Sequence, residues 1–236
     1  MNFRRYIVSI VIITSVFVGS DASTASSTIS SHSWNLKQWN ESQTLNWFPI
    51  ALVNATMNSS VQFNVTNYDP TNLSFPSTGT FSIGNFTLEN ATNFDISIAL
   101  TLSILSWTPG VYTHTNWTIH KTEAMSASES GFSQGDLAIQ DSIAYTLGSL
   151  VRKAIRFEYH QNTSIANQNT TLTYDYDTGV LLHGQSAVYF SNLYIIELQL
   201  VDSTLVTVSN TTVQVSGFLL PILAPLVLAL PNRRRH

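Results

Sequence analysis

Apolar and polar residues alternate along six segments of this chain. The segments are residues 61–66, 81–88, 94–104, 151–159, 171–177 and 193–201. Successive side chains of a β-strand point to opposite faces, so a period of two predicts strands with one buried face and one wet face. In the first segment we expect Val61, Phe63 and Val65 to point inward and Asn64 to point outward.

The longest alternation predicts a central core strand at residues 94–104. Every second position there is large and apolar: Phe94, Ile96, Ile98, Leu100, Leu102 and Ile104. In residues 81–88, Gly84 shifts the alternation by one position, which is typical of a bulge or a tight turn. Asp177-Thr178-Gly179 separates two apolar runs and predicts a hairpin.

Two segments lack this alternation. Residues 119–142 are expected to form a short helix or a mobile loop, and residues 34–47 receive no assignment despite three tryptophans. No Pro/Gly linker and no repeat divides residues 34–205, which we interpret as one β-rich ectodomain. The predicted class is all-β with minor helix, either an antiparallel β-sandwich or a half-open β-barrel.

The N-terminus has the pattern of a secretory signal peptide at residues 1–20. Arg4 and Arg5 precede a largely apolar stretch of 14 residues, and small residues follow. The alternative is an uncleaved anchor, although 14 residues fall short of the ~20 that a spanning helix needs. A Ser/Thr-rich, disordered lead-in is expected at residues 21–33.

The C-terminus predicts a membrane anchor at residues 217–231, after a Ser/Thr-rich tether at 206–216. Three arginines in the tail, residues 232–236, place that end in the cytoplasm and the ectodomain outside the cell. The alternative is a buried C-terminal strand, but Pro221 and Pro225 both disfavour a central strand.

This tail resembles the C-terminal sorting signals of archaeal surface proteins, in which a Pro-Gly-Phe motif precedes an apolar helix and a basic cluster. Here Ser216-Gly217-Phe218 precedes the apolar run, with serine in place of the proline. The resemblance implies cleavage by an archaeosortase and transfer to a lipid. A second resemblance, to lipoprotein carriers of the LolA type, rests on the hairpin at residues 174–182.

Eleven Asn-x-Ser/Thr sequons predict a glycosylated exterior protein. They begin at Asn40, Asn54, Asn58, Asn64, Asn72, Asn85, Asn90, Asn116, Asn162, Asn169 and Asn210. The chain has no cysteine, which counts against an animal secreted domain and fits an archaeal envelope. Residues 21–216 hold five basic and 14 acidic residues, a net charge of −9, which excludes a basic nucleic-acid-binding face.

Four sequence patterns were weighed as sites of chemistry. Asp177-Thr178-Gly179 matches the aspartic-protease triplet, but the chain has no second copy, so we interpret it as a turn. Asp175 and Asp177 lack the further oxygen ligands of a calcium site. His114 and His120 fit no zinc spacing. Residues 131–135 read Gly-x-Ser-x-Gly around Ser133, but no apolar strand precedes them.

We therefore expect no catalytic residue, metal or cofactor. The leading hypothesis is a non-catalytic envelope glycoprotein with a structural or interaction role, whose partners are membrane lipid at its anchor and envelope proteins or glycans. A carrier or sensor of apolar ligands and an extracellular hydrolase are the alternatives. A hollow core would favour the carrier, and converging acid–base groups in a cleft would favour the hydrolase.

Overall fold

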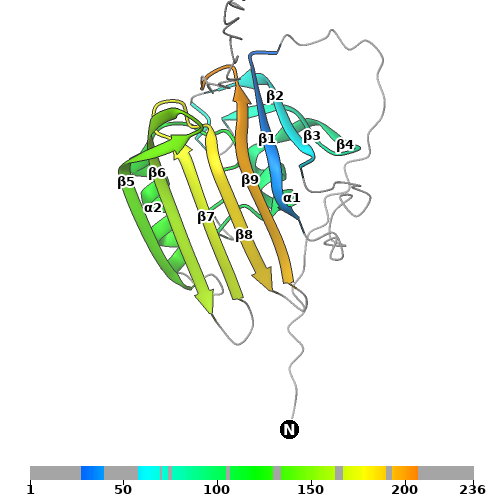
Figure 1. The fold of residues 1–236 in the computed structure, drawn as a ribbon. Coiled ribbons are helices and arrows are strands. Elements are labelled where there is room, and N and C mark those ends of the chain that lie inside the picture. Colours follow the sequence, from blue (N-terminus) through cyan, green and yellow to red (C-terminus); the bar gives the residue numbers. More distant parts are fainter. Residues whose placement is uncertain are drawn as a thin grey trace, which may run out of the picture.

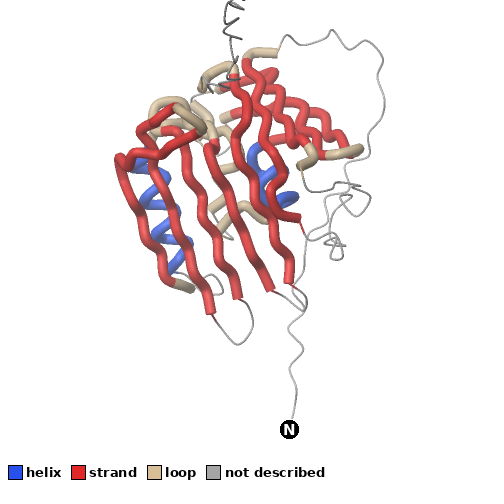
Figure 2. The backbone as a smooth tube through the Cα atoms, viewed as in Figure 1, coloured by secondary structure: helices blue, strands red, loops and turns tan. Residues whose placement is uncertain are grey.

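The computed structural model describes residues 28–39, 58–69, 71–73, 76–104, 107–129, 134–162, 167–189 and 193–206. These residues form nine strands and two helices (Figures 1 and 2): β1 Ser30–Trp39, β2 Ser60–Tyr68, β3 Ser77–Ile83, β4 Phe86–Thr92, α1 Asn93–Leu100, α2 Trp117–Glu129, β5 Asp136–Leu147, β6 Leu150–Asn162, β7 Asn167–Asp175, β8 Leu181–Tyr189 and β9 Leu193–Ser203.

The strands form a single open sheet in the order β4-β3-β2-β1-β9-β8-β7-β6-β5. Every neighbouring pair is antiparallel. The first and last strands lie side by side in the middle, and β4 and β5 are the two edges. The predicted class, all-β with minor helix, is confirmed. The arrangement is one open sheet, and not two stacked sheets.

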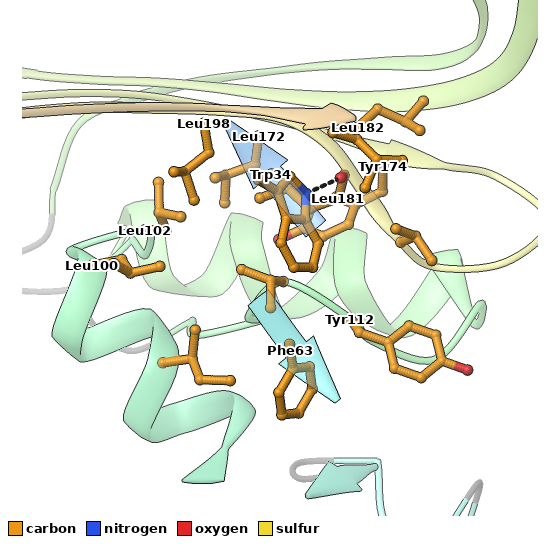
Figure 3. Close-up of a cluster of buried hydrophobic side chains, with 14 of the residues drawn as sticks. Trp34, Phe63, Leu100, Leu102, Tyr112, Leu172, Tyr174, Leu181, Leu182 and Leu198 are labelled. Carbon is orange, nitrogen blue, oxygen red and sulfur yellow. Dashed lines mark hydrogen bonds between the residues drawn. The ribbon is translucent and has the colours of Figure 1, made fainter. Parts of the chain in front are cut away.

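Both helices lie on the same side of this sheet, which we call its inner face (Figures 1 and 2). Side chains fill the space between the two layers (Figure 3). These side chains form the hydrophobic core. Its largest fully buried residues come from both halves of the sheet and from α1: Trp34, Tyr174, Phe63, Phe81, Phe157, Leu36, Ile83, Ile96 and Leu100. The indole N–H of Trp34 donates to the Leu181 carbonyl at 2.7 Å, which joins the central strand β1 to β8.

Register shifts bend the sheet, so that β2–β4 form a wing set at an angle to β5–β9 (Figure 1). The pairing of β1 with β9 shifts twice, between Ser33 and Trp34 and between Leu36 and Gln38. Further shifts occur between β2 and β3, β3 and β4, β5 and β6, and β7 and β8. Such irregularities increase the local twist and bend of a strand.

Several predicted elements are confirmed. In β2, Val61, Phe63 and Val65 are fully buried, and Asn64 is half-buried. Gly84 has a positive φ of 56° in the turn between β3 and β4. The predicted turn between β7 and β8 is also present, and Gly179 there has φ 74°. A Cβ on Gly179 would lie 2.0 Å from the Thr113 carbonyl oxygen, so this position requires glycine.

The predicted central strand at residues 94–104 is wrong, because its first part is helix α1. Thr92 caps this helix: its Oγ1 accepts the Asp95 N–H, and the Asp95 carboxylate accepts the Thr92 N–H. This reciprocal capping box overrides the alternation. The helical period then buries Ile96 and Leu100 and leaves Phe94 43% exposed.

Two strands were not predicted from the sequence. Strand β1 begins at Ser30, inside the expected disordered lead-in, because His32, Trp34 and Leu36 alternate toward the core and both neighbours pair with it. Strand β5 occupies the end of the segment expected to be helix or loop. Its pairing with β6 shifts between Gln140 and Ile143, and the polar Asp141 interrupts the apolar alternation there. Helix α2 confirms the helical alternative for the first part of that segment.

Candidate functional site

A cleft of about 590 Å³ lies beside both helices and is the strongest candidate for a binding site. Ligand pockets usually measure ~300–1,000 Å³. Leu73 from the β2–β3 connection, Phe94 from α1 and the segment 107–109 line one part of it. Thr113 and one face of α2 line the rest: His120, Thr122, Glu123, Ser126 and Ala127.

The base of the cleft is held by Trp107 and His120. The Trp107 indole N–H donates to His120 Nδ1 at 3.3 Å. His120 Nε2 lies 3.0 Å from Thr113 Oγ1 and 3.2 Å from the His114 carbonyl. Because Nδ1 accepts, Nε2 carries the proton and donates. Both ring nitrogens are therefore used in holding the site together.

This tautomer excludes His120 as a base for the neighbouring threonine. A general base needs a free lone pair facing the hydroxyl that it deprotonates, but the proton of His120 already faces Thr113. Burial also lowers the pKa of His120 to about 3, and the neighbouring His114 contributes in the same direction. The Thr113–His120 contact is structural.

His114 stacks on His120, with ring centroids 4.0 Å apart and ring planes 13° apart. Its Nδ1 accepts the Asn116 N–H at 3.1 Å. Its buried Nε2 makes no hydrogen bond with any described residue. Burial lowers the pKa of His114, and the Leu73 backbone opposes this shift without reaching normal hydrogen-bond geometry. The spacing of these two histidines along the chain did not predict that their rings would be stacked.

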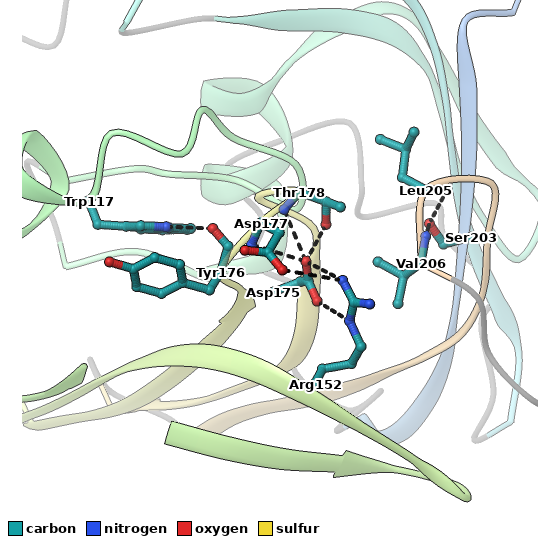
Figure 4. Close-up of polar contacts among 9 residues, drawn as sticks. All are labelled: Trp117, Arg152, Asp175, Tyr176, Asp177, Thr178, Ser203, Leu205 and Val206. Atoms are coloured by element: carbon teal, nitrogen blue, oxygen red, sulfur yellow. Dashed lines mark hydrogen bonds and ion pairs between the residues drawn. The ribbon is translucent and has the colours of Figure 1, made fainter. Parts of the chain in front are cut away.

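A second polar cluster surrounds Asp175 at the β7–β8 turn (Figure 4). Arg152 Nε and Nη2 donate to the two Asp175 oxygens at 2.6 and 3.1 Å. The backbone N–H and the hydroxyl of Thr178 also donate to this carboxylate, at 3.0 and 2.8 Å. Asp175 is fully buried, whereas the Asp177 side chain is 67% exposed.

This cluster fixes the turn and performs no evident chemistry. The Asp-Thr-Gly triplet is the predicted hairpin turn, and Asp175 is committed to Arg152 and Thr178. Trp117 of α2 also docks here, donating its indole N–H to the Tyr176 carbonyl at 2.8 Å. No group of three or more His, Asp or Glu side chains suited to a metal occurs in the described part of the chain.

Of the remaining candidate residues from the sequence, those with described positions do not converge on a site. Ser133 lies outside the described residues, as do the sequon asparagines Asn40, Asn54 and Asn210. Asn162 ends β6. Asn64 is half-buried, and its Oδ1 accepts the Ser31 hydroxyl at 2.7 Å. The other sequon asparagines are exposed: Asn58, Asn72, Asn85, Asn90, Asn116 and Asn169.

Comparisons of this chain with family models, with curated proteins and with solved structures find no match. Among the residues with described positions, no helix is long and apolar enough to cross a membrane. The predicted signal peptide at 1–20, most of the tether and the predicted anchor at 217–231 fall outside those residues.

Proposed function

We propose that this chain is a non-catalytic cell-surface glycoprotein with an interaction role. Residues 1–20 direct its secretion, and residues 217–231 anchor it. The observation that carries the proposal is the placement of the sequons: six of the seven whose asparagine side chains are described are exposed. They occur on the β2–β4 wing, before α2 and on β7, so glycans there would be compatible with the packed core.

The filled core supports this function over that of a lipid carrier. A carrier of the LolA type would hold its ligand against the inner face of the sheet. Here Trp34, Phe63 and Tyr174 occupy that space and are fully buried (Figure 3). A hydrolase is supported even less, because the histidine in the cleft is a structural donor and Asp175 is neutralised by Arg152.

Glycosylation is tested by expressing the chain in an archaeal or eukaryotic host that N-glycosylates. We expect Asn85→Gln and Asn116→Gln each to reduce the mass of the protein by one glycan, because both asparagines are exposed within sequons. Asn67→Gln is the matched control, since Asn67 is exposed in β2 but is not part of a sequon. Intact mass spectrometry of the three variants gives the answer. If neither sequon variant loses a glycan, the proposal loses its main support.

Anchoring is tested in the same host by ending the chain after Ser216. The apolar residues 217–231 are costly to leave in water, and the arginines that follow resist crossing the membrane. We expect the full chain in the membrane fraction and the shortened chain in the medium. Equal partitioning of the two chains between membrane and medium would contradict the anchor.

A further inference from the structure

The charge of the cleft is negative as far as its lining is described. Among the described residues that line it, Glu123 is the one charged side chain, and neither lysine nor arginine occurs. The nearest lysine along α2, Lys121, binds Asp141 of β5 at 2.8 Å. Within the described ranges, Glu123 makes no salt bridge. The arginines Arg152 and Arg156 are paired with other carboxylates, those of Asp175 and Glu158. Although Glu123 is exposed, the desolvation that it does experience raises the pKa of its carboxylate.

The rest of the lining is aromatic, apolar or hydroxylated. Phe94 is 43% exposed at the cleft, and Trp107, which also lines it, is nearly buried and fixed by its bond to His120. The faces of aromatic rings attract cations. Thr122 and Ser126 lie one helical turn apart on the same cleft-lining face of α2. The Thr122 hydroxyl donates to the Thr118 carbonyl, so its oxygen is left to accept.

We propose that this cleft binds a small organic ammonium ion with an apolar body. The ammonium group pairs with Glu123 and the hydroxyl oxygens beside it, and the apolar body packs against Phe94, Trp107 and Pro109. An anionic ligand meets no positive partner and would face the Glu123 carboxylate. A neutral ligand of the same shape gains the apolar contact but leaves the carboxylate unpaired.

This inference is independent of glycosylation and anchoring, so its failure is distinguishable from theirs. The probes are 4-phenylbutylamine, 4-phenylbutan-1-ol and 5-phenylpentanoate, which share a phenyl ring on four methylene groups and differ in the charge of the head group. Calorimetric titration uses the full chain in nanodiscs of uncharged glycolipid. The heat of titrating each probe into empty nanodiscs is subtracted. We expect the amine to bind about three- to thirtyfold more tightly than the alcohol, and the carboxylate to show no saturation.

Two variants on α2 decide whether Glu123 is responsible. Glu123→Gln is expected to bring the affinity for the amine down to that for the alcohol. Glu129→Gln, at the exposed end of the same helix and outside the cleft, is the matched control and should leave both affinities unchanged. A third variant, Phe94→Leu, keeps an apolar side chain at an exposed site. It should weaken binding of the amine more than binding of the alcohol.

Three results would overturn the proposal. The first is equal binding of amine and alcohol to the unaltered chain. The second is an equal loss of amine binding in Glu123→Gln and Glu129→Gln, which would indicate a general effect of charge. The third is no saturable binding of the amine at millimolar concentration.

Discussion

Lowering the pH from 7 to 4 is expected to destabilise this domain by roughly 5–7 kcal/mol through two buried histidines. Burial lowers the pKa of His32 to about 4 and that of His120 to about 3, from an ordinary value of 6.5. Well above pH 6.5 these histidines are neutral in both the folded and the unfolded state, so they do not change stability there. Between pH 6.5 and 3 the unfolded chain takes up protons that the folded chain excludes, so stability falls with pH.

Burial keeps His32 neutral when folded, although the charge of Asp202 opposes this shift of its pKa. Its two ring nitrogens lie 2.9 and 3.1 Å from the hydroxyls of Ser203 and Ser30, and the residue is fully buried. A hydroxyl satisfies a neutral imidazole but does not balance its charge. Since most domains are stable by only ~5–15 kcal/mol, the loss is comparable to the whole stability.

The measurement is urea unfolding at a series of pH values, together with the ring proton resonances of the histidines. We expect the His32 and His120 resonances to stay constant between pH 7.5 and 5.5. The variant His120→Gln should be less stable at pH 7 but show a shallower loss of stability toward pH 4. If either ring titrates near pH 6.5 in the folded protein, that histidine is not held neutral by burial, and the prediction is wrong.

Asp175→Ala is expected to destabilise the domain by about 3–5 kcal/mol. Removing one partner of a buried ion pair leaves the other without compensation. Arg152, whose side chain is only 25% exposed, would lose both of its hydrogen bonds to this carboxylate. Thr178 would lose its two bonds as well, and with them the turn that positions β8.

Asp177→Ala is the matched control, two residues away. The Asp177 carboxylate is 67% exposed and lies 4.0 Å from Arg152, so its loss should change stability by no more than about 0.5 kcal/mol. Urea unfolding at pH 7 compares the two variants. Similar losses in both would mean that the stabilisation comes from the net charge near Arg152 and not from the buried hydrogen bonds.

Most of the sheet was predictable from the sequence, because most strands have one buried and one wet face. Two local features hid the rest. The capping box of Thr92 and Asp95 turns an alternating segment into helix α1. In β5, an irregularity near Ser142, which has φ 58°, and the polar Asp141 interrupt the apolar alternation between Ile139 and Ile143. A window that counts alternation detects neither a cap nor a strand with such an interruption.

The candidate cleft was not predictable, because packing and not spacing creates it. Leu73, Phe94, Trp107 and Glu123 are far apart in the sequence and meet only when both helices lie on the inner face. Each alone has an ordinary explanation: an exposed leucine, an aromatic residue, a turn tryptophan and a solvated acid. By contrast, the turn at Asp177-Thr178-Gly179 was predictable, because its geometry depends on adjacent residues.

The central pairing of β1 with β9 has a consequence for how this chain folds. His32 and Ser203 are 171 residues apart and are bonded to each other. The β2–β4 wing and the β5–β8 meander consist of pairings between successive strands, but only β1 and β9 unite them. Contacts between distant residues slow folding, because a long loop must close first. The halves can therefore form early, while the complete sheet must wait for the last strand to be synthesised.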